Sequence, residues 1–313
     1  MRHVLSAGFV CGDLILSPVE DLPPLGGNRF VENAKLVIGG CAANAAVAFA
    51  RLLADTGGQS AVAGRVGRDD LGWLLRHALE TEGVDTSLLI ATERAATAIN
   101  TALVSADGER SFYVFGGACN FLAPDDLPDN LLRRFDHLHL AAMGALPGLA
   151  GEQGAEVACR ARALGLTVSL DITLNPPRDS RADILPLLRH VDLFLPNLGE
   201  AQAVLGEGSV DDLLTRGLAA GAGLMAIKLG ETGCALATSV ERIILPAFTV
   251  PVVDTCGAGD AWAAALVYGW RQGWPLGEIG RFANAAGALC IQSVGATEGL
   301  GNAAEIDRLL ASQ

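Results

Sequence analysis

One stretch near the C-terminus, residues 248–262, constrains this chain more than any other. It reads Phe-Thr-Val-Pro-Val-Val-Asp-Thr-Cys-Gly-Ala-Gly-Asp-Ala-Trp. Its apolar part (248–253) predicts a strand, and a helix is expected to begin near Asp260. The glycines between them leave backbone N–H groups open, and a helix start adds unpaired donors and the positive end of its dipole. The amides of Gly257, Ala258 and Gly259 therefore predict an anion site.

Asp260 puts a carboxylate at the mouth of this anion site, where its charge would be repulsive. The carboxylate would have a chemical use if it took a proton from a hydroxyl group that attacks a phosphoryl group. The alternative is a glycine-rich helix start with an acidic residue in its first turn, which is a common stabilising arrangement. The stretch by itself leaves both interpretations open.

Strand-like and helix-like segments alternate along the chain, most regularly after residue 150. This alternation predicts an α/β fold with a doubly wound, mainly parallel sheet flanked by helices. A first buried strand is expected over residues 4–10. Polar residues follow four of the expected strands, at the edge where open α/β sheets bind ligands. They are Asp13, Asp171, Asn197 and Asp254.

Two segments interrupt the alternation and predict a small β lid. Residues 14–36 are rich in proline and glycine, which makes them poor helix material. Residues 97–116 contain two β-prone runs, and the pair Asp107-Gly108 between them is typical of a hairpin turn. We expect both segments to be inserted in a single domain that spans residues 1–313.

Composition narrows the classes of function. The net charge of −13 disfavours a nucleic-acid-binding protein with a broad basic face. The seven cysteines are scattered without a C-x-x-C pair, so reduced thiols in a cytoplasm are expected rather than a zinc ribbon. No apolar run has the length of a membrane span or a signal peptide, so no membrane partner is expected. His137 and His139 share a face of an expected strand, either as a metal pair or as ordinary strand residues.

The stretch 254–260 also resembles a signature of the ribokinase-like (phosphofructokinase-B type) carbohydrate kinases, Asp-Thr-x-Gly-Ala-Gly-Asp. Upstream patterns resemble other motifs of this family in the same order: Gly8 with Asp13, Gly39-Gly40 with Asn44, Gly67 with Gly72, and Asn197 with Glu200. The resemblance implies ATP-dependent transfer of a phosphoryl group to a hydroxyl of a small sugar. It makes Asp260 the catalytic base and places the anion hole at Gly257, Ala258 and Gly259.

The resemblance also implies which residues bind each ligand. The implied sugar site consists of Asp13, Gly39, Gly40, Asn44 and Asp260. The implied ATP site consists of Asn197, Glu200, Lys228, Gly230, Thr255, Gly257, Gly259 and Asn284, with Mg²⁺ held by Glu200 through water. A potassium site is implied at Asp254, Cys256, Ser293 and Gly295, largely through carbonyl groups. The alternative for Asn197 and Glu200 is a capping box that stabilises a helix start.

The identity of the acceptor stays open. Ribokinases carry a glutamate in the segment that here reads Leu-His-Leu-Ala-Ala-Met-Gly (138–144), so ribose is not the expected acceptor. Fructose-like sugars, keto-deoxy acids and other sugars remain as candidate acceptors. The scarcity of basic residues near the expected sugar site favours a neutral acceptor. The aromatic residues of segment 112–115 leave a nucleoside kinase as the alternative, because aromatic side chains stack on nucleobases. A non-catalytic sugar-binding regulatory protein is a third interpretation, and the family's lid implies a homodimer.

Overall fold

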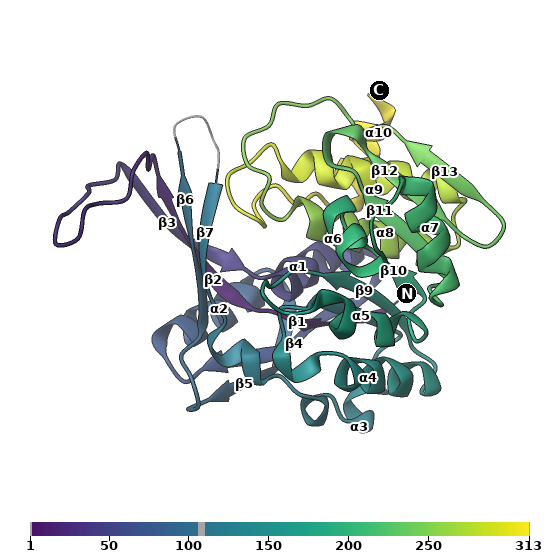
Figure 1. Ribbon diagram of the computed structural model, residues 1–313, viewed down its shortest axis with the longest axis horizontal. Coiled ribbons are helices and arrows are strands. Elements are labelled where there is room, and N and C mark those ends of the chain that lie inside the picture. Colours follow the sequence, from purple (N-terminus) through teal and green to yellow (C-terminus); the bar gives the residue numbers. More distant parts are fainter. Residues whose placement is uncertain (1, 106–109, 313) are drawn as a thin grey trace.

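Two sheets form the framework of the computed structural model, which describes residues 2–105 and 110–312. Figure 1 shows a large sheet with helices on both faces and a small sheet that stands to one side of it. The predicted turn at Asp107-Gly108 lies outside the described residues.

Within the described ranges, the large sheet has nine strands in the order β13-β12-β11-β10-β9-β8-β1-β4-β5. Neighbouring strands are parallel, except at the edge formed by β11, β12 and β13, which pair in antiparallel fashion. The strands are β1 (His3–Gly8), β4 (Gln59–Gly67), β5 (Val84–Thr92), β8 (His137–Met143), β9 (Thr167–Ile172), β10 (Leu193–Phe194), β11 (Leu224–Lys228), β12 (Cys234–Ala237) and β13 (Arg242–Leu245).

Helices cover both faces of the large sheet, and each face has its own hydrophobic core. α1, α2, α8 and α9 contribute to one core, and α4, α5, α6 and α7 contribute to the other. The strands between them are buried on both sides, as in β8, whose seven residues are all buried. The helices are α1 (Cys41–Leu53), α2 (Asp70–Thr81), α3 (Asp129–Leu132), α4 (Glu152–Ala163), α5 (Ser180–Leu188), α6 (Leu198–Leu205), α7 (Val210–Ala219), α8 (Ala258–Gln272), α9 (Leu276–Cys290) and α10 (Ala303–Ala311).

The described part of the small sheet has four strands in the order β3-β2-β6-β7. They are β2 (Cys11–Ser17), β3 (Asn33–Gly39), β6 (Ala98–Val104) and β7 (Arg110–Phe115). The register aligns Asp13, Asn100 and Val114 in one row, so their side chains share a face of the sheet. Lys35 lies on the same face and donates a hydrogen bond of 2.6 Å to Glu298. This face, called the inner face below, is therefore turned toward the C-terminal part of the chain.

The predicted fold class, a doubly wound and mainly parallel α/β fold with a second small sheet, is confirmed. The bounds of the first strand are wrong, because β1 ends at Gly8 and a new strand begins at Cys11. Gly8 passes so close to β8 that a Cβ atom on it would overlap the carbonyl oxygen of Ala141. Asp13 consequently belongs to the small sheet and does not follow the carboxyl end of β1.

The strand predicted over residues 248–253 is also wrong. This stretch runs as irregular backbone between β13 and α8. Pro246 and Pro251 lack the N–H donors that a strand interior needs. The N–H groups of Val253 and Asp254 donate instead to the carbonyl oxygen of Ile291, which holds the stretch against the end of α9. Asp254 therefore follows a loop and not a strand.

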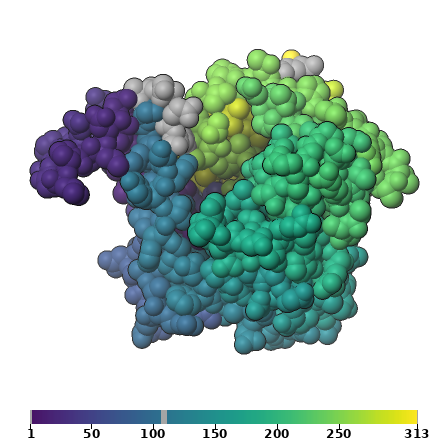
Figure 2. Space-filling model, in the orientation of Figure 1, coloured from purple at the N-terminus to yellow at the C-terminus, as the bar shows by residue number. Residues whose placement is uncertain are grey.

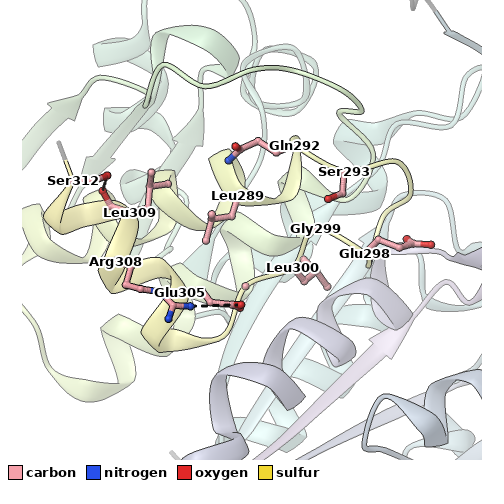
Figure 3. Close-up of a pocket in the computed structure, with 11 residues that line it drawn as sticks. Leu289, Gln292, Ser293, Glu298, Gly299, Leu300, Glu305, Arg308, Leu309 and Ser312 are labelled. Atoms are coloured by element: carbon pink, nitrogen blue, oxygen red, sulfur yellow. Dashed lines mark hydrogen bonds and ion pairs between the residues drawn. The ribbon is translucent and has the colours of Figure 1, made fainter.

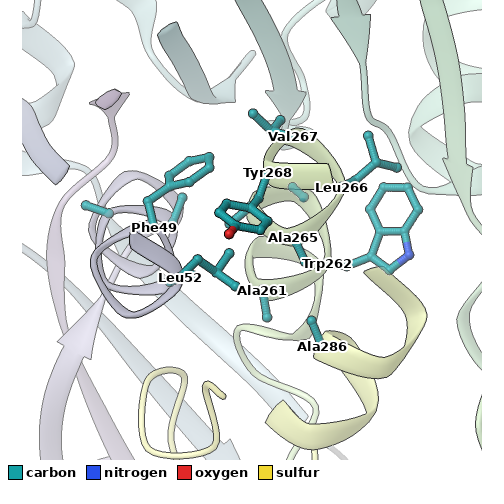
Figure 4. Close-up of a cluster of buried hydrophobic side chains, with 14 of the residues drawn as sticks. Phe49, Leu52, Ala261, Trp262, Ala265, Leu266, Val267, Tyr268 and Ala286 are labelled. Atoms are coloured by element: carbon teal, nitrogen blue, oxygen red, sulfur yellow. The ribbon is translucent and has the colours of Figure 1, made fainter. Parts of the chain in front are cut away.

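Two helices with many small side chains bring distant parts of the chain together. Alanines recur along the buried faces of both α1 and α8, which lets the helices approach closely. Figure 4 shows Phe49 and Leu52 of α1 beside Ala261, Ala265 and Tyr268 of α8 in the shared core. This packing sets the relative position of the first turns of the two helices.

His137 and His139 are buried strand residues with hydroxyl partners. Nε2 of His137 and Nδ1 of His139 lie 2.8 Å and 2.7 Å from the hydroxyl oxygen of Ser169. Burial lowers the pKa of both imidazoles, that of His139 to about 4. No group of three or more metal-ligating side chains occurs among the described residues. Within the same residues, no helix combines the length and apolar character needed to cross a membrane.

Removing the fully buried aromatic side chain of α1 from the core that α1 shares with α8 should destabilise the fold. Phe49 is fully buried, so Phe49→Ala should lower the free energy of unfolding by about 3–5 kcal/mol. Urea denaturation followed by circular dichroism measures this loss. Trp73→Ala, on the exposed side of α2, is the control and should cost no more than about 0.5 kcal/mol. A similar small loss for Phe49→Ala would contradict the packing described here.

Candidate active site

The helix predicted at the anion site begins at Ala258, with Gly257 as its N-cap. Gly257 has a φ of 75°, and a Cβ atom there would overlap the carbonyl oxygen of Ala296. At Gly259, by contrast, the nearest atom to an added Cβ is Nζ of Lys228, at 3.5 Å. Gly257 therefore serves the backbone geometry of the turn, whereas Gly259 keeps the space in front of the helix amides open.

Asp260 is a buried carboxylate in the first turn of α8. Its Oδ2 accepts a hydrogen bond of 2.8 Å from Nδ2 of Asn44 on α1. Burial, and next the negative charge of Asp171, raise the pKa of Asp260 to about 7 against the opposing effects of Asn44 and Lys228. A carboxyl group with this pKa can accept a proton near neutral pH and release it again, as a general base must.

The Asp13 carboxylate is held in place on the inner face of the small sheet. Its Oδ1 accepts hydrogen bonds from Nδ2 of Asn100 at 2.9 Å and from the Cys11 thiol at 3.3 Å. Gly39 lies against the carboxyl group so closely that a Cβ atom there would overlap it. Burial raises the pKa of Asp13, while the two hydrogen bonds oppose this effect. Within the described residues both bonds end on Oδ1, which leaves Oδ2 for a ligand.

Gly40 links this carboxylate to the helix that carries Asn44. It is the N-cap of α1 with a φ of 92°, and a Cβ atom on it would lie 2.5 Å from the carbonyl oxygen of Phe9. Only glycine fits this left-handed position beside the end of β1. Gly39 and Gly40 are therefore needed for close backbone packing, whether or not they contact a ligand. Together they bring the segment of Asp13 next to the start of α1.

Asn197 and Glu200 form the capping box at the start of α6. Asn197 Oδ1 accepts from the Glu200 amide at 2.9 Å, and Glu200 Oε2 accepts from the Asn197 amide at 2.7 Å. This arrangement leaves Oε1 of Glu200 outside the box. Burial, with a smaller contribution from Asp171, raises the pKa of Glu200 against the effect of Lys228. Asn197 and Glu200 therefore do cap the helix, as the alternative interpretation predicted. The cap uses only one of the two carboxylate oxygens of Glu200.

A cavity of about 630 Å³ opens beside the start of α8. The irregular stretch 248–252 supplies part of an apolar wall, which Trp262 and Ile291 complete. Five residues predicted to bind ATP line this cavity: Lys228, Gly230, Thr255, Gly259 and Asn284. The side chain of Asn284 already has partners, since it accepts from Nε1 of Trp262 and donates to the carbonyl of Pro246, both at 2.9 Å.

The residues predicted to hold potassium lie where the loop after α9 meets the segment before α8. The buried carboxylate of Asp254 accepts from the Cys256 amide at 2.7 Å and from the Gly295 amide at 2.8 Å. Asp254 therefore ties the two segments together. Ser293 lines a separate pocket of about 530 Å³, with Glu298 near it on the same loop (Figure 3).

A hollow between the small sheet and the C-terminal part of the chain is visible in Figure 2. Asp13 and Asn100 lie on the inner face of the small sheet, and Asp13 is close enough to Asp254 to be affected by its charge. Sequence reasoning missed Asn100, although a single asparagine in the apolar run 98–103 was a signal. It also noted Asp171 only as a residue near a strand end, without its partner Lys228.

A buried carboxylate with a raised pKa thus lies beside an open helix start and a cavity in this α/β fold. Comparison with known proteins identifies the family: the family described as "pfkB family carbohydrate kinase" matches residues 1–302. The chain is 33% identical to the ATP-dependent ribose-1-phosphate kinase of Halopiger xanaduensis, over 95% of this chain and 94% of that protein. It is 31% identical to the aminoimidazole riboside kinase of Salmonella typhimurium, over 88% of each protein.

A solved structure shows the same likeness. The ribokinase of Arabidopsis thaliana complexed with ribose and ATP superposes with a TM-score of 0.84, at 26% identity, over 99% of this chain and 98% of that one. The chain therefore belongs to the pfkB family of carbohydrate kinases, and the predicted family is confirmed. The predicted class of enzyme, an ATP-dependent phosphotransferase with an alcohol group as acceptor, is confirmed with it.

The pKa of Asp260 predicts how activity depends on pH. The carboxyl group must be ionised to accept a proton, so kcat/KM should rise about tenfold per pH unit and level off above about pH 7. Asn44→Leu removes a hydrogen bond that lowers this pKa, so the break in the profile should move to higher pH. A pH series of the ATP-dependent reaction, with the acceptor found by the panel below, measures both. A wild-type break near the ordinary aspartate pKa of about 4, or a shift to lower pH in Asn44→Leu, would contradict this assignment.

Proposed function

We propose that this chain transfers the γ-phosphoryl group of ATP to a hydroxyl group of a small sugar, with Asp260 as the base. The observation that carries the proposal is the position of Asp260 at the start of α8, where Asn44 of α1 donates a hydrogen bond to it. There a proton acceptor with a pKa of about 7 adjoins the amides of an open helix terminus. Phosphoryl transfer needs these two features together, because the nucleophile loses a proton while negative charge is held on the phosphoryl group.

In this proposal the sugar occupies the cleft beside the inner face of the small sheet. Oδ2 of Asp13 accepts a hydrogen bond from one sugar hydroxyl, and Asp260 takes the proton of the hydroxyl that attacks. The amides of Gly257, Ala258 and Gly259 hold the phosphoryl oxygens, where preorganised donors contribute most to the rate. The remaining proposed sugar contacts are Gly39, Gly40 and Asn44.

We assign residues 1–313 to one kinase domain in which the small sheet acts as a lid. The segments at about 14–36 and 97–116 supply the lid. The contact between Lys35 and Glu298, at 2.6 Å, joins the small sheet to the loop after α9 and supports this role. A lid over the cleft would exclude water and so favour transfer to the sugar over hydrolysis of ATP.

The proposed nucleotide site is the 630 Å³ cavity. Its apolar wall suits the adenine ring, and its polar end lies at Gly259 and Lys228, where the phosphates belong. Thr255, Gly230 and Asn284 line the same cavity. Magnesium fits the carboxylate oxygen of Glu200 outside the capping box, through water, because Mg²⁺ prefers hard oxygen donors and retains water. When bound, the metal would neutralise phosphate charge near Asn197.

A potassium ion beside the anion hole is part of the proposal. In support, Asp254 accepts hydrogen bonds from the amides of Cys256 and Gly295 and so brings the backbones of two segments together. Ser293 lies two positions before Gly295 in the chain. We also propose a cytoplasmic location, because the seven cysteines of the chain are free thiols.

The acceptor is proposed to be a neutral sugar. Four carboxylates, those of Asp13, Asp171, Asp254 and Asp260, concentrate negative charge around the site, and like charge disfavours an acceptor that already carries a phosphate. The second candidate is a nucleoside. It is favoured by Phe112, which lies on the inner face in register with Ala102 and is half exposed, so that its ring is available for stacking.

A panel of acceptors tests the proposal. Release of ADP from ATP should depend on one of D-fructose, D-ribose, 2-dehydro-3-deoxygluconate, ribose 1-phosphate, adenosine and aminoimidazole riboside, each assayed with and without K⁺. With the best acceptor, Asp260→Asn should lower kcat by about 10²–10⁴-fold and leave the circular dichroism spectrum unchanged. Near wild-type turnover in Asp260→Asn would refute the base assignment, and loss of signal with every acceptor would sink the proposal.

A homodimer through the small sheet is also proposed. The face opposite to the inner face exposes Leu36, Tyr113 and Phe115, which are 44%, 60% and 49% exposed. Apolar side chains clustered on one face of an open sheet favour association. Tyr113→Asp combined with Phe115→Asp should convert the dimer into a monomer in analytical ultracentrifugation at micromolar concentration. Val240→Asp, at an exposed site in the turn between β12 and β13, is the control, and a wild-type monomer would contradict the proposal.

A further inference from the structure

The buried carboxylate of Asp171 has no role in the proton transfer proposed above. Asp171 lies in β9 and Lys228 ends β11, with the short strand β10 between them in the sheet. Because β10 ends at Phe194, the two side chains meet across its carboxyl end. Nζ of Lys228 donates to Oδ1 of Asp171 at 2.8 Å and to Oδ2 at 3.0 Å.

This ion pair needs an explanation because burying it is costly. The side chains of Lys228 and Asp171 are only 15% and 4% exposed. The desolvation of two charges commonly offsets their attraction, so apolar residues would stabilise this place in the sheet equally well. The pair is therefore not explained by stability alone.

The position of the ammonium group supplies the explanation. Nζ of Lys228 lies 3.5 Å from the point where a Cβ atom of Gly259 would stand, which places it at the open helix start. Lys228 and Gly259 also line the same cavity. An ammonium group has three N–H donors, and the two contacts with Asp171 use two of them. One donor is left for a ligand in the cavity.

We propose that Asp171 is a positioning residue that holds the ammonium group of Lys228 at the Gly259 end of the anion site and balances its charge until the γ-phosphate of ATP arrives. The inference rests on the proposed function. When ATP binds, the ammonium group donates to a γ-phosphate oxygen while it keeps a contact with Asp171. No proton is transferred in this step. Asp171 also keeps the positive charge of Lys228 from pairing with the base, Asp260.

Two substitutions should change affinity for the γ-phosphate in opposite directions. The measured quantity is the ratio of affinities for AMP-PNP and ADP, obtained by isothermal titration calorimetry with Mg²⁺. Lys228→Met removes the donor, so this ratio should fall at least about tenfold. Asp171→Asn keeps the lysine but no longer balances its charge, so the ratio should rise about threefold or more. A residue that serves only the fold would change both affinities by the same factor.

Asp192→Asn is the matched control. Asp192 is a partly buried carboxylate near the opposite end of the same strands, where it accepts from the amide of Val168 at 2.8 Å. Its substitution should leave the affinity ratio unchanged. Melting temperatures of all variants report whether they fold. If Asp171→Asn does not fold, Lys228→Met decides alone, and an unchanged ratio overturns the inference.

The outcomes separate this inference from the proposed function. A wild-type chain that binds neither AMP-PNP nor ADP would overturn the proposed function and the inference with it. A wild-type chain that binds AMP-PNP, with ratios that stay unchanged or shift in the same direction in the two variants, would overturn the inference alone. Opposite shifts, with an unchanged ratio in Asp192→Asn, would support Asp171 as the residue that balances the charge of Lys228 beside the γ-phosphate.

Discussion

The packing of α1 on α8 is the contact on which the rest of the site depends. Small side chains along both helices let their axes approach, and Phe49 and Tyr268 fill the core between them. As a consequence Asn44 reaches Asp260, which lies 216 positions further along the chain. The same burial that keeps water from this carboxylate raises its pKa to about 7. The burial that stabilises the fold and the raised pKa of Asp260 therefore come from one interface, because a loosely packed interface would hydrate the carboxylate and lower its pKa.

Positively and negatively charged groups oppose one another around the start of α8. A helix terminus and the ammonium group of Lys228 attract an anion, whereas Asp171, Asp260 and Glu200 repel one. Without a ligand, the positive groups offset only part of the negative charge. The site becomes favourable for a triphosphate when cations accompany it, which is consistent with the net charge of −13 on the whole chain. The two glycines have different structural roles: Gly257 allows the turn, and Gly259 leaves room for a ligand.

Much of the fold could be predicted because its determinants are local. The alternation of strand-like and helix-like segments predicted the doubly wound sheet, and the glycines before Asp260 predicted the start of α8. The error at residues 248–253 has a physical reason: this run is apolar because it walls a cavity, and periodicity cannot distinguish that use from a strand. Asp13 stays a predicted site residue, but its strand was predicted wrongly, because the bend at Gly8 depends on close contact with Ala141 of another strand.

The sequence by itself determined the order of elements, the helix start with its glycines, and the carboxylate that follows them, since each depends on residues a few positions apart. Only the tertiary structure decided which side chains those groups would meet. The hydrogen bonds of Asp260 with Asn44, of Asp13 with Asn100 and of Lys228 with Asp171 all join residues far apart in the chain. Such partners depend on strand order and helix packing, which local sequence patterns do not predict. Burial has the same origin, which is why the raised pKa of Asp260 became visible only in the folded chain.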